Sequence, residues 1–277
     1  MNKPDYAREN TVAAEKQLRG GPYFPGRVDA CPRILFVGNS ITLHGRKPEI
    51  GWNVEWGMAA SAKENDYVHR TMAGVQKAYP NADFAIVQQA TWERNFWTGD
   101  APLLPTAEAR DWKPHVVIIR LGENTPAELL KNGDYAEALV SLARFYGGDT
   151  AEYLVTDEFW PNEAKDDALR RAAEMLNAAF VRISDLGEMA EMKAYGLFEH
   201  SGVAAHPGDR GMQAIADRIL NHGGAEDYLR FLSTGGSDYP INELKIAGVD
   251  LTRPEAVASA MRVFDESVTE FEQALNL

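Results

Sequence analysis

Three residues of types that together support acyl transfer stand at separate places in the chain. Ser40 follows the apolar run Ile34–Val37 after two residues, Asn124 comes after a second apolar run, and His206 precedes a proline. A serine hydroxyl is a poor nucleophile unless a base takes its proton, and a histidine titrates in a range suited to that task. An asparagine amide can donate to the oxyanion of a tetrahedral intermediate. These residue types predict covalent catalysis at a carbonyl carbon, provided that the fold brings them together.

Four or five short apolar runs are typical of buried parallel strands, because they lack the alternation of a half-exposed strand. They are Ile34–Val37, Phe84–Val87, Val116–Ile119, Tyr153–Val155 and Phe180–Ile183. Between them, stretches rich in Ala, Glu, Lys and Leu predict helices, for example over Trp56–Ala78, Tyr135–Phe145 and Lys165–Ala178. The alternation predicts an α/β fold in which helices cover both faces of a parallel sheet. The residues that follow each strand should then meet at one edge.

Three segments resemble the sequence blocks of the SGNH (GDSL-type) hydrolases over roughly residues 30–222. Val37-Gly38-Asn39-Ser40-Ile41-Thr42 resembles the first block, G-D-S, with asparagine in the middle. Leu121-Gly122-Glu123-Asn124 resembles the G-x-N-D block, with Thr125 in place of the aspartate. His206-Pro207-Gly208-Asp209-Arg210-Gly211 resembles the last block, H-P-x-x-x-G. The resemblance implies a flavodoxin-like three-layer α/β/α sandwich with about five parallel strands. It also implies a Ser40 nucleophile, a His206 base, and an oxyanion hole that includes the Ser40 amide and the Asn124 side chain.

The acid that normally orients the histidine is missing from this pattern. The family usually has aspartate three residues before the histidine, and this chain has Val203 there. A backbone carbonyl could accept the ring N–H and leave a Ser-His dyad. Alternatively Glu199 could reach the ring, or Asp157 or Glu158 could approach from the end of the fourth strand. We favour the dyad or Glu199.

The glycine of the family's second block is also missing, since residues 88–93 read QQATWE. A backbone amide can donate whatever its side chain, so we expect Ala90 to supply the second oxyanion donor. Gly57 precedes the second strand and is a worse match. Aromatic and acidic residues cluster at the expected active edge and suit sugar rings or apolar acyl groups, although simple core packing should account for at least half of them. They are Trp52, Trp56, Trp92, Glu93, Phe96 and Trp97.

Each motif has an ordinary alternative when it is taken alone. A serine after a strand is most often a helix N-cap, and asparagine is common in turns. Asp209 is best interpreted as a helix N-cap rather than a site residue. His44, His69, His115 and His222 show no ligand spacing, and the chain lacks H-E-x-x-H, paired cysteines and glycine-rich nucleotide motifs. We therefore expect neither metal nor cofactor.

Composition narrows the classes of partner. The 277 residues suit one α/β domain with an appendage, and their formal net charge is -13. Such a charge argues against nucleic acid and against anionic membranes as partners. A single cysteine, Cys31, excludes an internal disulfide, and the first residues lack the apolar segment of a signal peptide. We expect a cytoplasmic location.

The last part of the chain differs in character from the rest. We expect the α/β domain to cover residues 1–224 and a helical extension to cover residues 225–277, with helices over Glu226–Leu232 and Pro254–Leu275. Residues 228–277 resemble the extreme C-terminal part of the oligoendopeptidase F family, whose zinc motif lies upstream of that part and is missing here. The tail therefore implies no peptidase activity. Its helices could pack on the main domain or pair with a second copy.

The sequence predicts a serine esterase that forms an acyl-enzyme at Ser40. A small acyl group, acetyl above all, on a carbohydrate is the preferred substrate, on the basis of the resemblance and the aromatic edge. A lipase-like or thioester hydrolase is the alternative within enzymes. Because Val203 replaces the acid and the second-block glycine is missing, a degenerate module that binds a glycan without cleaving it is the alternative outside them.

Overall fold

A parallel β-sheet forms the centre of the molecule. The computed structural model describes residues 23–24, 26–221, 245–246 and 249–250. Five parallel strands lie in the order β3 (Asp83–Gln88), β2 (Arg33–Gly38), β4 (Val116–Arg120), β5 (Glu152–Thr156) and β6 (Ala179–Val181). A short strand, β1 (Tyr23–Phe24), pairs antiparallel with β3 at one edge. A separate antiparallel pair is formed by β7 (Lys245–Ile246) and β8 (Val249–Asp250).

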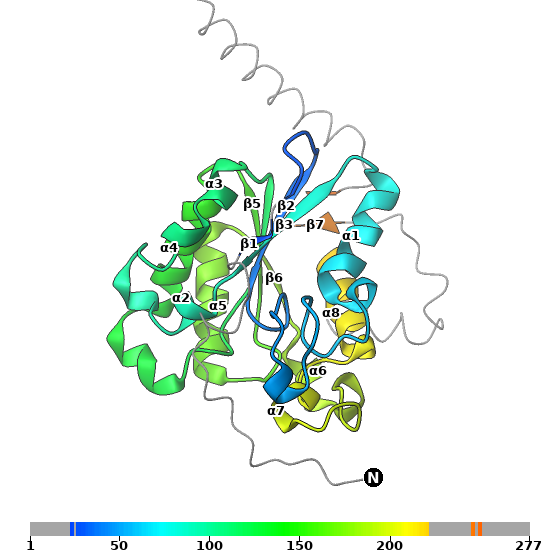
Figure 1. The fold of residues 1–277 in the computed structure, drawn as a ribbon. Coiled ribbons are helices and arrows are strands. Elements are labelled where there is room, and N and C mark those ends of the chain that lie inside the picture. Colours follow the sequence, from blue (N-terminus) through cyan, green and yellow to red (C-terminus); the bar gives the residue numbers. More distant parts are fainter. Residues whose placement is uncertain (1–22, 25, 222–244, 247–248, 251–277) are drawn as a thin grey trace, which may run out of the picture.

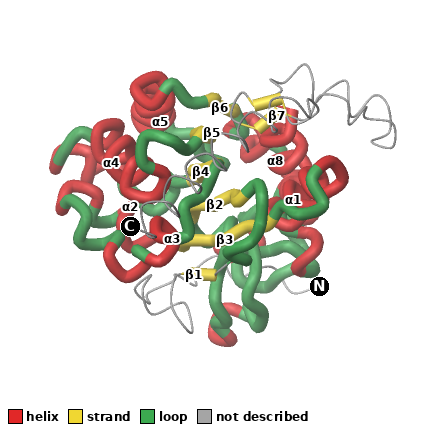
Figure 2. Tube along the Cα trace, turned by 90° about the horizontal axis from the view of Figure 1, so that it is seen from above, coloured by secondary structure: helices red, strands yellow, loops and turns green. Residues whose placement is uncertain are grey.

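Helices cover both faces of this sheet (Figures 1 and 2). On one face lie α1 (Tyr67–Ala78) and α8 (Asp209–Asn221), and on the other lie α4 (Tyr135–Gly147) and α5 (Glu163–Leu176). Each strand contributes side chains to the hydrophobic core on either face of the sheet, because alternate side chains point to opposite faces. Ile34 and Phe36 of β2 pack on the α1/α8 side, whereas Leu35 and Val37 pack on the α4/α5 side. The chain thus forms a three-layer α/β/α sandwich.

Short helices occupy the loops that connect these layers. The α-helical segments are α2 (Ala90–Glu93), α3 (Glu108–Asp111), α6 (Ser184–Glu188) and α7 (Ser201–Ala204). The 3-10 segments are Pro48–Ile50, Lys63–Asn65, Phe96–Thr98, Leu104–Thr106, Ala127–Asn132 and Ala190–Met192. Within the described ranges, no helix is long and apolar enough to cross a membrane.

The five-strand parallel sheet predicted from the sequence is confirmed, with two corrections at element ends. Ile183 lies outside β6 and is the N-cap residue that precedes α6. The helix predicted from Trp56 begins only at Tyr67, because Asp66 caps it by accepting the His69 amide. Ala59 has a positive φ of 75°, which a helix does not tolerate. The helices predicted over residues 226–232 and 254–275 lie outside the described residues.

Candidate active site

Ser40 and His206 meet at the carboxyl edge of the sheet. Ser40 stands two residues beyond the end of β2, and His206 stands between α7 and α8. The Ser40 Oγ lies 2.8 Å from His206 Nε2. Gly38 allows the tight turn between strand and serine, since a Cβ there would lie 1.8 Å from Thr42 Oγ1. The two residues predicted to react are therefore within hydrogen-bond distance, although 166 positions separate them in the chain.

A backbone carbonyl orients the histidine ring. His206 Nδ1 lies 2.6 Å from the carbonyl oxygen of Gly202. A carbonyl can only accept, so the proton sits on Nδ1 and leaves Nε2 free to accept from the Ser40 hydroxyl. Of the alternatives left open by the sequence, this is the dyad arrangement. Val203 is 1% exposed and packs in an apolar cluster with Ile50 and Trp52.

The two carboxylates considered as orienting acids lie elsewhere. Glu199 is exposed, and the Gly202 carbonyl occupies the ring position that it would have taken. Asp157 is buried and accepts the amides of Ile183 and Ser184 at the start of α6, at 2.5 and 3.0 Å. Burial raises the pKa of Asp157 to about 6, against these two hydrogen bonds. Asp157 therefore anchors α6 and does not orient His206.

The surroundings of His206 favour its neutral form. Desolvation lowers the pKa of His206 to about 4, and the nearby His44 and Arg120 add to this, whereas the Gly202 carbonyl and Glu123 oppose it. The ring of Trp160 lies edge-on to the imidazole, with 5.2 Å between centroids. A neutral imidazole at physiological pH can accept a proton, which a general base requires.

Two of the three predicted oxyanion donors are placed near the sheet edge with an N–H to spare. Within residues 26–221, the Ser40 backbone amide donates to no protein acceptor. The Asn124 side-chain amide donates one N–H to Glu93 Oε2 at 2.8 Å and keeps the other. The third expectation is corrected: the Ala90 amide is engaged by Gln88 Oε1 at 3.2 Å, because α2 begins there and the Gln88 side chain folds back.

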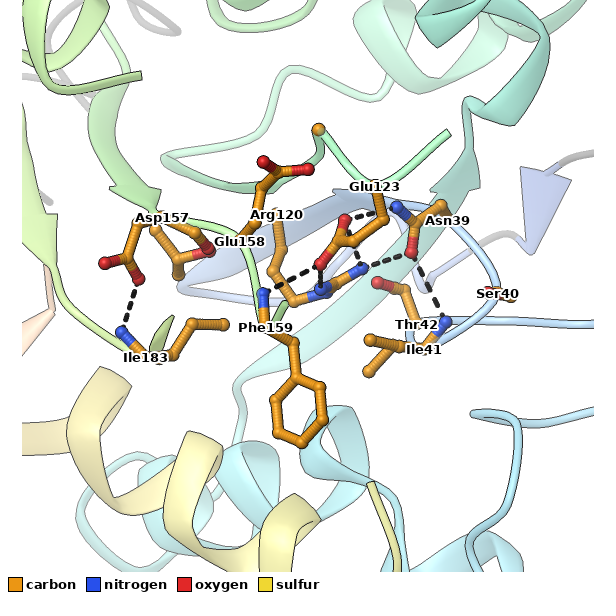
Figure 3. A network of polar contacts seen from close by, with 12 residues as sticks. Asn39, Ser40, Ile41, Thr42, Arg120, Glu123, Asp157, Glu158, Phe159 and Ile183 are labelled. Carbon is orange, nitrogen blue, oxygen red and sulfur yellow. Dashed lines mark hydrogen bonds and ion pairs between the residues drawn. The ribbon is translucent and has the colours of Figure 1, made fainter. Parts of the chain in front are cut away.

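A buried polar network lies beneath the turn that carries Ser40 (Figure 3). Asn39 Nδ2 donates to Glu123 Oε2 at 2.7 Å and to Glu93 Oε1 at 3.1 Å. The Arg120 guanidinium contacts both Glu123 and the Asn39 Oδ1. Burial raises the pKa of Glu93, and Glu123 raises it further, whereas Arg120 holds the pKa of Glu123 low. Asparagine suits position 39 because an aspartate there would be a third carboxylate beside these two.

A second buried pair supports the loop after β4. Lys165 Nζ donates to Glu158 Oε1 at 2.6 Å and to the Gly122 carbonyl at 3.1 Å. Gly122 has a φ of 140°, and a Cβ there would lie 2.6 Å from Glu158 Cγ. Desolvation first, and then Glu123, raise the pKa of Glu158 to about 8 despite Lys165. Close packing on Glu158 therefore explains why a glycine stands at position 122, in the segment that resembles the G-x-N-D block.

No role for Arg120, Glu123, Lys165 or Trp160 is predicted from the sequence. One signal was present: Arg120 ends the apolar run Val116–Ile119, and a charged residue in such a position is buried only when it has partners. The partners themselves come from other strand ends, so the sequence alone could not pair them.

Most of the aromatic residues expected at the active edge pack in the core. Trp92 and Phe96 belong to the α4/α5 core together with Tyr135, and Trp52 is 2% exposed. The buried Glu93 belongs to the polar network, Trp56 is half-buried, and only Trp97, with 38% exposure, is open to solvent. The predicted aromatic platform is thus much smaller than the sequence suggested.

The remaining polar residues of the prediction have structural contacts. His44 is buried with Nδ1 on the Gly45 carbonyl, His69 contacts Asp66, and His115 accepts from the Arg33 amide. Asp209 is the first residue of α8 rather than its cap, and its carboxylate accepts from Ser61. In the described ranges, no three His, Cys, Asp or Glu side chains gather as metal ligands.

Comparisons with curated proteins find similarity to oligopeptidases over a short segment. No family model matches the chain. Oligopeptidase PepF of Bacillus subtilis is 43% identical over 65 residues, which are 23% of this chain and 10% of that protein. Group B oligopeptidase PepB of Streptococcus agalactiae is 46% identical over 61 residues, 21% of this chain and 10% of that protein. The chain spans about a tenth of the length of these relatives.

Comparisons with solved structures find GDSL-like lipases and esterases. A protein of Parabacteroides merdae described as a GDSL-like lipase has a TM-score of 0.42 and 18% identity, covering 68% of this chain and 93% of that one. A two-domain esterase active on acetylated mannans has a TM-score of 0.44 and 21% identity, covering 75% and 51%. A family two carbohydrate esterase from Cellvibrio japonicus has a TM-score of 0.42 and 15% identity, covering 73% and 63%.

Proposed function

We propose that the protein is a serine esterase that hydrolyses small acyl esters through an acyl-enzyme at Ser40. The observation that carries this proposal is the 2.8 Å contact between Ser40 Oγ and His206 Nε2, with the ring held in the required tautomer by Gly202. A serine that served only as a turn or cap residue would not need a base on its hydroxyl.

Each step of ester hydrolysis can be assigned to a group at this site. Ser40 Oγ attacks the ester carbonyl while His206 Nε2 takes its proton. The oxyanion accepts hydrogen bonds from the Ser40 backbone amide and from the free N–H of the Asn124 side chain. His206 then protonates the leaving alcohol, and water attacks the acyl-enzyme with His206 again as base. The Gly202 carbonyl supports the imidazolium as a dipole, where a carboxylate would have supplied a full charge.

As the acyl group we propose acetyl, and as the alcohol a carbohydrate. The ring of Trp160 packs nearly perpendicular to that of His206, and Trp97, in the loop after α2, is exposed. Aromatic surfaces suit sugar rings. A lipase-like or thioester hydrolase would instead show rising activity with acyl length.

The test is hydrolysis of p-nitrophenyl acetate, butyrate and octanoate by the wild type, Ser40→Ala and His206→Ala. Both variants should lose at least about 1000-fold in kcat/KM, and acetate should be the best substrate. A fluorophosphonate probe should label the wild type and not Ser40→Ala. If octanoate is the best substrate, the proposed acetylesterase activity is wrong and a lipase-like activity is supported. A wild type no faster than Ser40→Ala and left unlabelled would refute the esterase, and binding of acetylated oligosaccharides would then support a glycan-binding module.

A further inference from the structure

We propose that Glu93 is the positioning residue that fixes the Asn124 side-chain amide as an oxyanion donor. This inference rests on the proposed esterase function. Glu93 comes from α2, after strand β3, where the SGNH pattern would have supplied a glycine and its amide. Instead of donating to the oxyanion, this segment contributes a carboxylate that holds another donor.

The contacts of Glu93 reach both halves of the site. Its Oε1 accepts from the Gly122 amide at 2.6 Å, from Asn39 Nδ2 at 3.1 Å and from the Asn124 amide at 3.2 Å. Its Oε2 accepts from Asn124 Nδ2 at 2.8 Å. The side chain is fully buried. One carboxylate thus connects the turn that carries Ser40 to the loop that carries Asn124.

The orientation of the Asn124 amide follows from what lies on either side of it. Its Nδ2 faces an acceptor, Glu93, and its Oδ1 faces a donor, Arg94 Nη2, at 3.4 Å. A flipped amide would set donor against donor and acceptor against acceptor, so the network selects one orientation. With one N–H held by Glu93, the other remains available at the partly exposed side chain.

A carboxylate is needed because both of its oxygens accept. In Glu93→Gln one oxygen can keep the three bonds that Oε1 now accepts, and the new NH₂ group then faces Asn124 Nδ2. The Asn124 amide must turn away or flip, and its carbonyl would replace the oxyanion donor. The variant therefore disturbs the Asn124 side chain specifically while it keeps most of the buried contacts.

The experiment is a double-mutant cycle of Glu93→Gln and Asn124→Ala in p-nitrophenyl acetate hydrolysis, with Asp157→Asn as the matched control. Asp157 is another buried carboxylate that follows a strand at the same edge, and its side chain accepts from the amides of Ile183 and Ser184. Asn124→Ala should lower kcat about 100- to 1000-fold, and Glu93→Gln about 10- to 100-fold, each with little change in KM. The double variant should be no slower than Asn124→Ala alone. The proposal would be overturned if the two losses multiplied in the double variant, or if Glu93→Gln were no slower than Asp157→Asn.

Side-chain amide NMR of the wild type gives a readout that needs no activity. The Asn124 pair, assigned by its disappearance in Asn124→Ala, should show one downfield, slowly exchanging proton bound to the Glu93 carboxylate. In Glu93→Gln that proton should return to the ordinary range. An ordinary pair in the wild type would refute the positioning role, whatever the kinetics. If the pair behaves as expected but the wild type is no faster than Ser40→Ala, the esterase fails and the contact survives without a catalytic purpose.

Discussion

His206 donates its Nδ1–H to the carbonyl oxygen of Gly202 at 2.6 Å, in the place where a triad would have a carboxylate. The short helix α7 makes this possible, because it turns the Gly202 carbonyl toward the ring while the Val203 side chain points into an apolar cluster. The contact fixes the tautomer but adds no negative charge. The imidazole ring is therefore well oriented, and its protonated form is only weakly stabilised.

The pH dependence of activity should reflect the desolvation of His206, which lowers its pKa more than the Gly202 carbonyl raises it. The lowered pKa of His206, about 4, keeps the imidazole neutral through the physiological range, so kcat/KM for p-nitrophenyl acetate should be nearly constant from about pH 6 to pH 8. It should fall at lower pH, with a midpoint near 4. His206→Ala serves as the control for background hydrolysis. A midpoint close to 6.5, the value of an unperturbed histidine, would show that the ring is more solvated than the structure indicates.

An aspartate at position 203, where the SGNH pattern has one, should not create a triad. Val203 is 1% exposed among apolar side chains, so Val203→Asp places a carboxylate where nothing pairs with it. We expect a loss of unfolding free energy on the order of 3 kcal/mol and no gain in kcat/KM. Comparing the thermal melts of Val203→Asp and Val203→Ala separates the effect of the buried charge from the effect of lost packing. Higher activity together with a raised pH midpoint would mean that the new carboxylate had reached His206.

Asn39→Asp should destabilise the protein, increasingly so at high pH. The change replaces the N–H donor shared by Glu93 and Glu123 with a third carboxylate. Its pKa should be raised, so the variant keeps its stability at low pH and loses it as pH rises through that pKa. Melting temperatures at pH 5 and pH 8 measure this. Adding Glu123→Gln exchanges amide and carboxylate between the two positions and should recover much of the loss. A pH-independent deficit without rescue would point to packing instead.

Glu158→Gln should flatten the decline of stability between about pH 4 and pH 8. The pKa of Glu158 is raised to about 8, against an ordinary value of about 4.3. Its contribution is therefore present in full below pH 4 and is lost as the pH rises through 8. Glutamine keeps the oxygen that accepts from Lys165 and cannot ionise. Between pH 5 and pH 8 the variant should gain on the order of 5 °C in melting temperature relative to the wild type. If the difference in melting temperature between variant and wild type is the same at pH 5 and pH 8, Glu158 is ionised throughout this range.

The sheet could be predicted from sequence because burial on both faces leaves a local signature. The runs at Ile34, Phe84, Val116 and Tyr153 are continuous apolar segments, and each became a strand within one residue or two of its predicted bounds. The helix predicted to begin at Trp56 was placed too early in the chain. Its apolar periodicity continues through residues 56–66, but this segment forms turns at Gly57 and Ala59, and the helix starts only after Asp66.

The sequence by itself determined the strand pattern and the identity of Ser40, Asn124 and His206 as candidates, because motif glycines and apolar runs depend on neighbours in the chain. Only the tertiary structure decided what orients them. The Gly202 carbonyl reaches His206 through the turn of α7, and Glu93 reaches Asn124 from an adjacent strand end. Hydrogen bonds between segments far apart in the chain have no local signature. The sequence therefore could not show that the Gly202 carbonyl contacts His206 or that Glu93 contacts Asn124.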